Sequence, residues 1–235
     1  MKQKLKDALP YQWKLNIRLL KRFFSELKSR HIYAKDYHSE DIGNFKNEFR
    51  QVVRNGDFYE NKIHNLKIVS QKINNIIINP DEVFSFWKTV GKPDEKNRFK
   101  IGRNLIKNNI CEDFGGGICQ FSSIIYYSAL QAGLTILERH SHSVDIYKEH
   151  ERSTPLGADS TVVFGYKDLQ FKNGFPFSIQ LKCCIIDNTL FLTILSQKEI
   201  SISRISFRYQ ENEKGIWVET LNNNKSLFKN FYIRR

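Results

Sequence analysis

The sequence predicts an α+β fold, in which N-terminal helices precede a cysteine-bearing helix packed on a mainly antiparallel sheet. Two observations favour this class. Before Gly133 the apolar residues recur mostly at helical spacing, and after Thr135 they alternate with period two in short runs separated by turn residues. Helices followed by strands are typical of α+β proteins. With 235 residues, 40% of them hydrophobic, the chain is long enough for a sizeable core.

Residues 10–30 predict a basic amphipathic helix, with Pro10 suited to its first turn. The net charge of +12 is concentrated near this helix, because residues 1–35 hold ten Lys or Arg against two acidic residues. Two interpretations are open: attachment to an anionic membrane surface or another polyanion, and packing of the apolar stripe on the domain. The apolar stripe consists of Trp13, Ile17, Leu20, Phe24 and Leu27.

The next part of the chain divides into an irregular stretch and a second predicted helix. Residues 31–60 show no clear period, and residues 61–78 have helical spacing up to the helix-ending pair Asn79-Pro80. Residues 83–87 predict a short strand. We therefore expect a basic N-terminal helical region over residues 1–60 and an α+β domain over residues 61–235.

A run of three glycines lies just before Cys119, which is at the start of a predicted helix. Residues 121–132 have apolar side chains at helical spacing, and Gly133 ends the helix. A helix N-terminus favours the thiolate, which is the nucleophilic form of cysteine. Cys119 is therefore a candidate nucleophile, although a buried cysteine beside a tight turn is the alternative interpretation.

The same turn offers backbone N–H groups that could stabilise an oxyanion. A phosphate-binding loop is disfavoured, because the run lacks the Gly-Lys-Ser/Thr ending of such a loop. The candidate residues for the oxyanion are Gly115, Gly116, Gly117 and Gln120.

From Thr135 onward the pattern predicts strands. If residues 136–146 are extended, period-two alternation puts His140 and His142 on one face. Asp159 then leads a β-branched run that also predicts a strand. Further strands are expected near residues 169–171, 177–186, 190–195, 200–209 and 216–221.

A thiolate nucleophile needs an imidazole partner and a third group that orients the imidazole. The chain offers these groups in a workable order: Cys119, then His140 or His142, then Asp159. The same order of cysteine, histidine and aspartate occurs in papain-like and transglutaminase-like folds, which is an analogy of order alone. Each residue also has a structural interpretation, as a half-buried histidine or a turn aspartate.

Metal binding through Cys119, the two histidines and Cys111 is another alternative. No second clear ligand pair completes such a site, so we expect no metal and no cofactor.

Several other classes are disfavoured. The four cysteines are too few and too irregularly spaced for a disulfide scaffold, and Cys183 and Cys184 should point to opposite faces of a strand. No apolar run spans a bilayer, and the N-terminus lacks the features of a cleavable signal peptide. No nucleic-acid-binding motif accompanies the basic residues. We expect a cytoplasmic protein, peripheral on the inner membrane face if it binds membranes.

Five segments together resemble the VanW family, named for an accessory protein of vancomycin-resistance operons. The resemblance spans roughly residues 64–195, and Asp81 and Ser160 depart from the residues common in the family without touching the candidate chemistry. The segments are residues 79–86 (NPDEVFSF), 115–120 (GGGICQ), 138–143 (ERHSHS), 157–162 (GADSTV) and 167–173 (KDLQFKN).

The resemblance implies a role in peptidoglycan metabolism or glycopeptide resistance. Some larger, exported members are described as L,D-transpeptidases that use the cysteine matching Cys119. Among the histidines, the one matching His142 is the more regular in the family, which favours it as the base over His140. The expected function is a cysteine acyltransferase acting on a peptidoglycan peptide or wall precursor, and the alternative is a non-catalytic module that binds such precursors.

Overall fold

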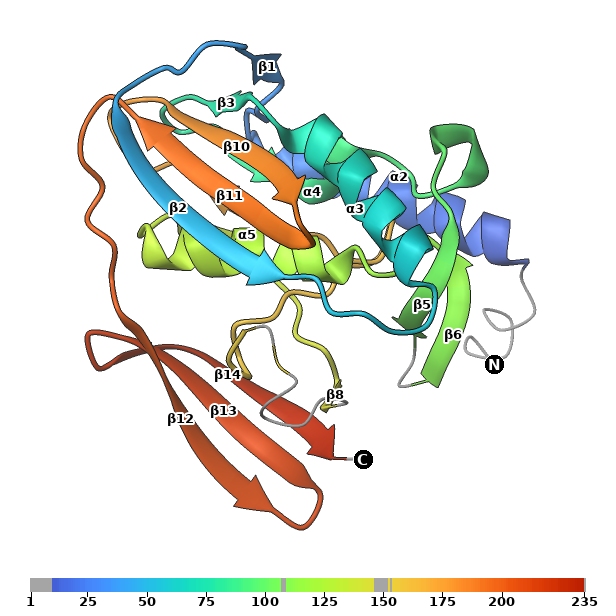
Figure 1. Cartoon of the computed structure of the whole chain (residues 1–235). Helices are drawn as coiled ribbons and strands as arrows, with labels where there is room; N and C mark the ends of the chain where they lie inside the picture. Colours follow the sequence, from blue (N-terminus) through green and yellow to red (C-terminus); the bar gives the residue numbers. More distant parts are fainter. Residues whose placement is uncertain (1–9, 107–108, 146–151, 153, 235) are drawn as a thin grey trace.

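The computed structural model describes residues 10–106, 109–145, 152 and 154–234. It confirms the α+β class, with helices around mainly antiparallel sheets. Figure 1 shows two parts joined by an extended connection: a larger part that holds the helices and the central sheet, and a smaller C-terminal sheet.

The central sheet has five antiparallel strands in the order β1-β3-β10-β11-β2. Its middle is the hairpin of β10 and β11. Each of these strands has eight residues, and all eight pair with the other strand without interruption. Two of its strands come from residues 31–60, for which the sequence pattern predicts no clear element. The strands are β1 (Asp36–Tyr37), β2 (Phe45–Val52), β3 (Ile76–Ile78), β10 (Ile179–Ile186) and β11 (Thr189–Ser196).

Helices α3 (Tyr59–Ile73) and α5 (Cys119–Gln131) cover the central sheet and bury the main core. The prediction that the second helix continues to residue 78 is wrong. The backbone becomes extended at Asn74, Asn75 takes a left-handed conformation, and the following isoleucines pair with β10 as β3. Sheet pairing therefore outweighs the helical spacing of these apolar residues.

A three-stranded sheet, β4-β9-β7, lies beside α4 and carries the residues that lead into the site. The predicted strand over residues 83–87 ends early, because Ser85 caps α4 by accepting a hydrogen bond from the Lys88 N–H at 3.3 Å. Phe84 on β4 stacks on Phe171 of β9, with ring centroids 5.0 Å apart. The elements are β4 (Val83–Ser85), α4 (Phe86–Val90), β7 (Thr135–Glu138) and β9 (Gln170–Lys172).

The strand expected over residues 136–146 is wrong beyond Glu138. Strand β7 ends there after an irregularity in its pairing with β9, and the chain continues as a loop to β8 (Val144–Asp145); Ile146 lies outside the described residues. The strand expected after Asp159 is also absent from the described chain, where Val163 forms an isolated bridge with Lys167. The two histidines and Asp159 therefore lie on loops.

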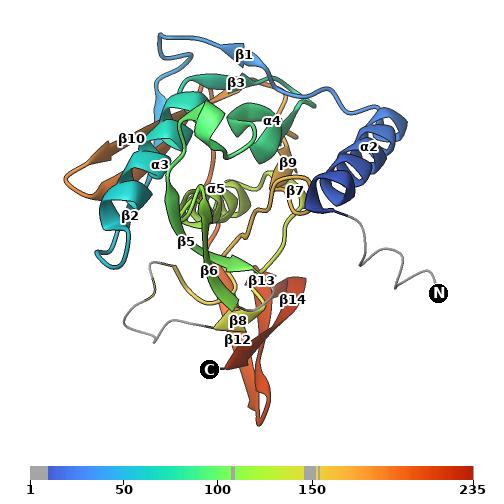
Figure 2. The same ribbon diagram turned by 90° about the vertical axis from the view of Figure 1, so that its right-hand side faces the viewer.

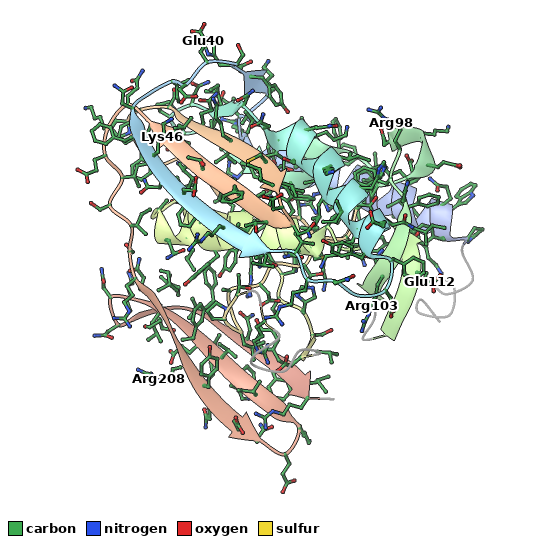
Figure 3. All side chains as sticks on the ribbon, in the orientation of Figure 1. Glu40, Lys46, Arg98, Arg103, Glu112 and Arg208 are labelled. Atoms are coloured by element: carbon green, nitrogen blue, oxygen red, sulfur yellow. The ribbon has the colours of Figure 1, made fainter. Side chains whose placement is uncertain are left out.

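The hairpin of β5 (Ile101–Ile106) and β6 (Asn109–Phe114) precedes the glycine turn, after the 3₁₀ turn Glu95–Asn97. It has no counterpart among the sequence-based expectations. Arg103 and Glu112 are paired across it and carry charge on its surface (Figure 3).

The C-terminal sheet has the order β12-β13-β14-β8. Tyr232 and Val218 form a small second core with residues around Leu156, so the loop that carries Asp159 packs on this sheet. Sequence patterns predict β12 and β13 and miss β14. The strands are β12 (Ile205–Asn212), β13 (Gly215–Asn222) and β14 (Lys225–Arg234).

Helix α2 (Tyr11–Ser29) confirms the predicted N-terminal helix and lies on the outside of the molecule beside β7 and β9 (Figure 2). Leu15 is its buried residue. Among the described residues, no helix has the length and apolar character needed to cross a bilayer.

Candidate active site

The glycine turn places Cys119 at the first residue of α5, as the sequence predicts. Gly115 and Gly117 have φ values of 77° and 90°, which residues with side chains rarely adopt. Gly116 lies against the backbone of Gly102, where a Cβ would come within 2.1 Å of the Gly102 carbonyl carbon. Each glycine thus has a steric reason, and together they hold the hairpin, the turn and α5 close to one another.

The Cys119 thiol is half-buried and faces the loop after Asp159. Its Sγ lies 3.6 Å from Thr161 Oγ1 and 3.8 Å from the carbonyl oxygen of Val162. Burial acts to raise the pKa of the thiol, but a hydrogen bond to His142 and the charge of that imidazole outweigh burial and lower the pKa. The structure therefore favours a thiolate paired with an imidazolium.

His142 is held by Asp159 through two hydrogen bonds. The ring Nδ1 and the backbone N–H of His142 both lie 2.7 Å from Asp159 Oδ2. Burial acts to lower the pKa of His142, but the bonds to Asp159 and Cys119 raise it to about 10. Because Nδ1 faces the carboxylate, Nε2 is the nitrogen left for the thiol. Cys119, His142 and Asp159 thus form one hydrogen-bonded chain.

The second oxygen of Asp159 is bound by two residues that sequence patterns do not single out. Arg139 Nη2 lies 3.0 Å from Asp159 Oδ1, and the Tyr232 hydroxyl donates to the same oxygen at 2.5 Å. Burial acts to raise the pKa of Asp159, but the bond to His142 and the charge of Arg139 hold it well below its usual range. The carboxylate is therefore ionised and satisfied at both oxygens.

Arg139 is itself fixed on all sides, with a side chain only 3% exposed. It donates to the carbonyl oxygens of Gly157 and Asp159 and to the Asn230 side chain, and its guanidinium stacks 4.8 Å from the Tyr126 ring centroid. Arg139 lies inside the segment that resembles the VanW family, so its role could have been suspected. Asn230 and Tyr232 lie on β14, which no sequence pattern predicts.

His140 and the Gln120 side chain do not join this chain of residues. His140 Nε2 lies 3.0 Å from Glu138 Oε1, whereas Gln120 Nε2 donates to the Val52 carbonyl oxygen at 2.9 Å. The expectation that both histidines share one face fails because no strand extends through them. Among the described residues, no group of three His, Cys, Asp or Glu side chains is arranged to hold a metal, so the metal hypothesis lacks a donor set.

Backbone donors at the turn divide into bonded and open groups. The N–H groups of Gly115, Ile118 and Gln120 donate to carbonyl oxygens of the turn or of the preceding loop. Within the described parts of the chain, no backbone oxygen accepts a bond from the N–H of Gly116, Gly117 or Cys119. Of these, the N–H groups of Gly117 and Cys119 are the nearest to the thiol along the chain and are the candidates for stabilising an oxyanion.

The thiol opens onto a cleft of about 610 Å³, which is within the range of small-molecule and peptide-group sites. Lys62 on α3 lines this cleft, and its side-chain stem lies over Gly117. Burial lowers the pKa of Lys62 to about 8. No acidic group of the described chain pairs with its ammonium group, so Lys62 is a cation in the cleft that sequence patterns did not reveal.

Comparison with known proteins finds two curated relatives. The chain is 29% identical over 164 residues to "Vancomycin B-type resistance protein VanW" of Enterococcus faecalis (strain ATCC 700802 / V583), an alignment that covers 68% of this chain and 60% of that protein. It is 30% identical over 142 residues to "Uncharacterized protein YoaR" of Bacillus subtilis (strain 168), covering 60% of this chain and 45% of that protein. The alignments thus span 60% or less of each relative, and no solved structure gives a match.

A family profile described as "VanW like protein" matches residues 61–195, which is more than half of the chain. The matched range contains Cys119, Arg139, His142 and Asp159, but not Tyr232. The resemblance inferred from sequence motifs is therefore confirmed, and the chain belongs to the VanW-like protein family.

Proposed function

We propose that the protein is a cysteine acyltransferase that acts on peptidoglycan-type peptides, with Cys119 as nucleophile. The observation that carries this proposal is the chain of hydrogen bonds from Asp159 through His142 to the Cys119 thiol, at the edge of a cleft. A buried structural cysteine needs none of these partners, as Cys183 shows, because burial and the neighbouring Cys184 raise the pKa of its thiol.

In the first half-reaction, the Cys119 thiolate attacks the carbonyl carbon of a substrate amide. The negative charge that develops on the carbonyl oxygen is stabilised by the N–H groups of Gly117 and Cys119. The C–N bond then breaks, and His142 donates its Nε2 proton to the leaving amine. The product is a thioester on Cys119 and a neutral imidazole.

In the second half-reaction, an amine or a water molecule attacks the thioester carbonyl carbon. Neutral His142 takes the proton of the attacking group, and the Cys119 sulfur leaves as thiolate, which restores the ion pair. Asp159 keeps the imidazole in one orientation and stabilises its cationic form throughout. An amine acceptor gives a cross-linked or exchanged peptide, and water gives a hydrolysed one.

The substrate class rests on the family. One relative bears a name that refers to vancomycin resistance, and some larger, exported members of the family are described as L,D-transpeptidases that use the matching cysteine. We extend this substrate class to the present chain because its matched segment contains the thiol, the imidazole and the carboxylate together.

The proposal is tested by incubating the protein with a mixture of muropeptides and measuring the mass of the intact chain. We expect an added acyl mass on the wild type that disappears with hydroxylamine, which cleaves thioesters. The Cys119→Ala variant should form no adduct. A Cys184→Ala variant is the matched control, because Cys184 is an exposed cysteine outside the cleft and its removal should change nothing.

The same samples test the alternative function, a module that binds wall precursors without chemistry. If wild type and Cys119→Ala bind muropeptides equally and neither gains mass, the binding module is favoured and the acyltransferase proposal fails. An adduct found on Cys184 rather than on Cys119 would equally contradict it.

A further inference from the structure

Helix α2 is fixed to the domain by one face. Leu15 is 2% exposed and lies against Gly165. Arg22 forms ion pairs with Glu138 and Asp168, and Glu26 accepts an ion pair from Lys88 at 2.7 Å. These contacts determine the rotation of the helix about its axis, so the direction of its other side chains is set by the fold.

The opposite face of α2 presents the apolar stripe that the sequence predicts. Trp13 is 64% exposed, Leu20 56% and Phe24 60%. The interpretation that this stripe packs on the domain is therefore wrong, because Leu15 and Leu19 take that place. Figure 2 shows α2 at the margin of the molecule. The outer face comprises Trp13, Ile17, Leu20, Phe23, Phe24 and Leu27, all of which are exposed.

The charged residues of α2 that flank the outer face are basic. Helical spacing puts Lys21 and Lys28 in a row along one flank of the stripe. Glu26 is the acidic residue of α2 and is engaged on the inner side by Arg22 and Lys88. An apolar stripe flanked by lysines is complementary to a surface that offers both acyl chains and negative headgroups.

We propose that this outer face binds the surface of an anionic phospholipid bilayer. The helix would lie parallel to the bilayer plane, with the stripe among the acyl chains and the lysine row at the phosphates. Two copies of the face are poorly suited to each other, because a two-fold interface would bring identical lysine rows together without acidic partners from this helix. Binding of this kind would hold the Cys119 cleft near membrane-linked substrates, but it does not depend on any chemistry at Cys119.

The test is flotation of the full chain with vesicles of phosphatidylglycerol and phosphatidylcholine, compared with phosphatidylcholine alone. We expect flotation with the anionic vesicles that weakens in 0.5 M salt, together with a blue shift of tryptophan emission that is lost in Trp13→Phe.

The double variant Leu20→Glu, Phe24→Glu should abolish flotation. Lys21→Gln and Lys28→Gln should each weaken binding on the order of fivefold. Ile186→Glu is the matched control, since Ile186 is 55% exposed on β10, and its binding should equal that of the wild type.

Three results would overturn the proposal. The first is absence of flotation with anionic vesicles, and the second is equal, salt-independent binding to both lipid mixtures. The third is a wild-type dimer in solution that Leu20→Glu converts to a monomer, which would make the face an interface between copies. Iodoacetamide labelling of Cys119 in the Leu20→Glu, Phe24→Glu variant shows that the domain is folded, and we expect it to match the wild type.

Discussion

Asp159 and Asp168 are two carboxylates on either side of residues 160–167, with side chains 15% and 1% exposed, and their pKa values shift in opposite directions. The pKa of Asp159 is lowered, whereas burial raises that of Asp168. Each is an ion-pair partner of an arginine, Arg139 for Asp159 and Arg22 for Asp168. Proximity to an arginine therefore does not explain the difference.

The difference lies in how many charged donors touch each carboxylate. Asp159 contacts the Arg139 guanidinium at 3.0 Å and the imidazole of His142 at 2.7 Å. Asp168 is only 1% exposed and is bound mainly by neutral donors, with Arg22 at 3.5 Å. Those neutral donors are the Ser85 hydroxyl, the Gln170 amide and the N–H groups of Trp87 and Leu169.

The two networks begin at neighbouring residues. Arg139 reaches Asp159, whereas Glu138 binds Arg22 and accepts the backbone N–H of Asp168 at 2.8 Å. At the end of β7, Arg139 thus holds the candidate site and the preceding residue, Glu138, anchors α2. Pairing with two cations thus keeps the Asp159 carboxylate ionised, whereas the neutral donors around Asp168 hold the fold together.

The largest effect is expected from replacing each aspartate by asparagine. Asp159→Asn leaves Arg139 buried without its carboxylate, so we expect a loss of about 3–5 kcal/mol in the free energy of unfolding. Asp168→Asn keeps one acceptor oxygen but turns an NH2 group toward two of its four neutral donors, so we expect a smaller loss of about 1–3 kcal/mol. Urea denaturation at pH 7 measures both. Equal losses would break the distinction between the two carboxylates.

The two histidines provide the next test. His142→Ala removes the partner of the thiol, so the pKa of Cys119 should rise and iodoacetamide labelling at pH 7 should slow at least about tenfold. His140→Ala should change the rate less than about twofold, because His140 pairs with Glu138. Labelling is followed by mass spectrometry of the Cys119 peptide. A larger effect at His140 would contradict the site as described.

The pH dependence of stability should have opposite signs at the two aspartates. The folded pKa of Asp159 is lowered, so its contribution is complete above the ordinary pKa of 3.8 and is lost as pH falls below it. The folded pKa of Asp168 is raised, so its contribution declines as pH rises above 3.8. The difference in free energy of unfolding between wild type and Asp159→Asn should therefore shrink from pH 7 to pH 3. From pH 4 to pH 7, the free energy of unfolding of Asp168→Asn should rise relative to that of the wild type.

The smallest effect concerns Lys62, a cation without an acidic partner among the described residues. Its charge should attract anions into the cleft, so Lys62→Met should reduce the ratio of iodoacetate to iodoacetamide labelling of Cys119 by a few-fold. Lys92→Met is the matched control, since Lys92 lines the same cleft but pairs with Asp94 at 3.3 Å. A ratio that depends on Lys92 and not on Lys62 would reverse this assignment.

Sequence patterns predicted the regular elements better than the connections. Helices α2 and α5 and the β10–β11 hairpin follow from the spacing of their apolar residues. The strand expected through His140 and His142 failed because its pairing partner β9 is short and ends opposite Glu138. Strand β14 was missed because its residues 225–234 alternate weakly and gain their role through pairing with β13.

The α+β class, the placement of Cys119 at a helix start and the family follow from the amino-acid sequence, because they depend on local spacing and on contiguous motifs. Tertiary contacts are needed to show that His142 and not His140 joins the thiol, and that Tyr232 contacts Asp159 from 73 positions away. They are also needed to show that the apolar stripe of α2 faces outward. These features depend on contacts between distant segments, and a periodicity within one segment carries no information about which partner its side chains will meet.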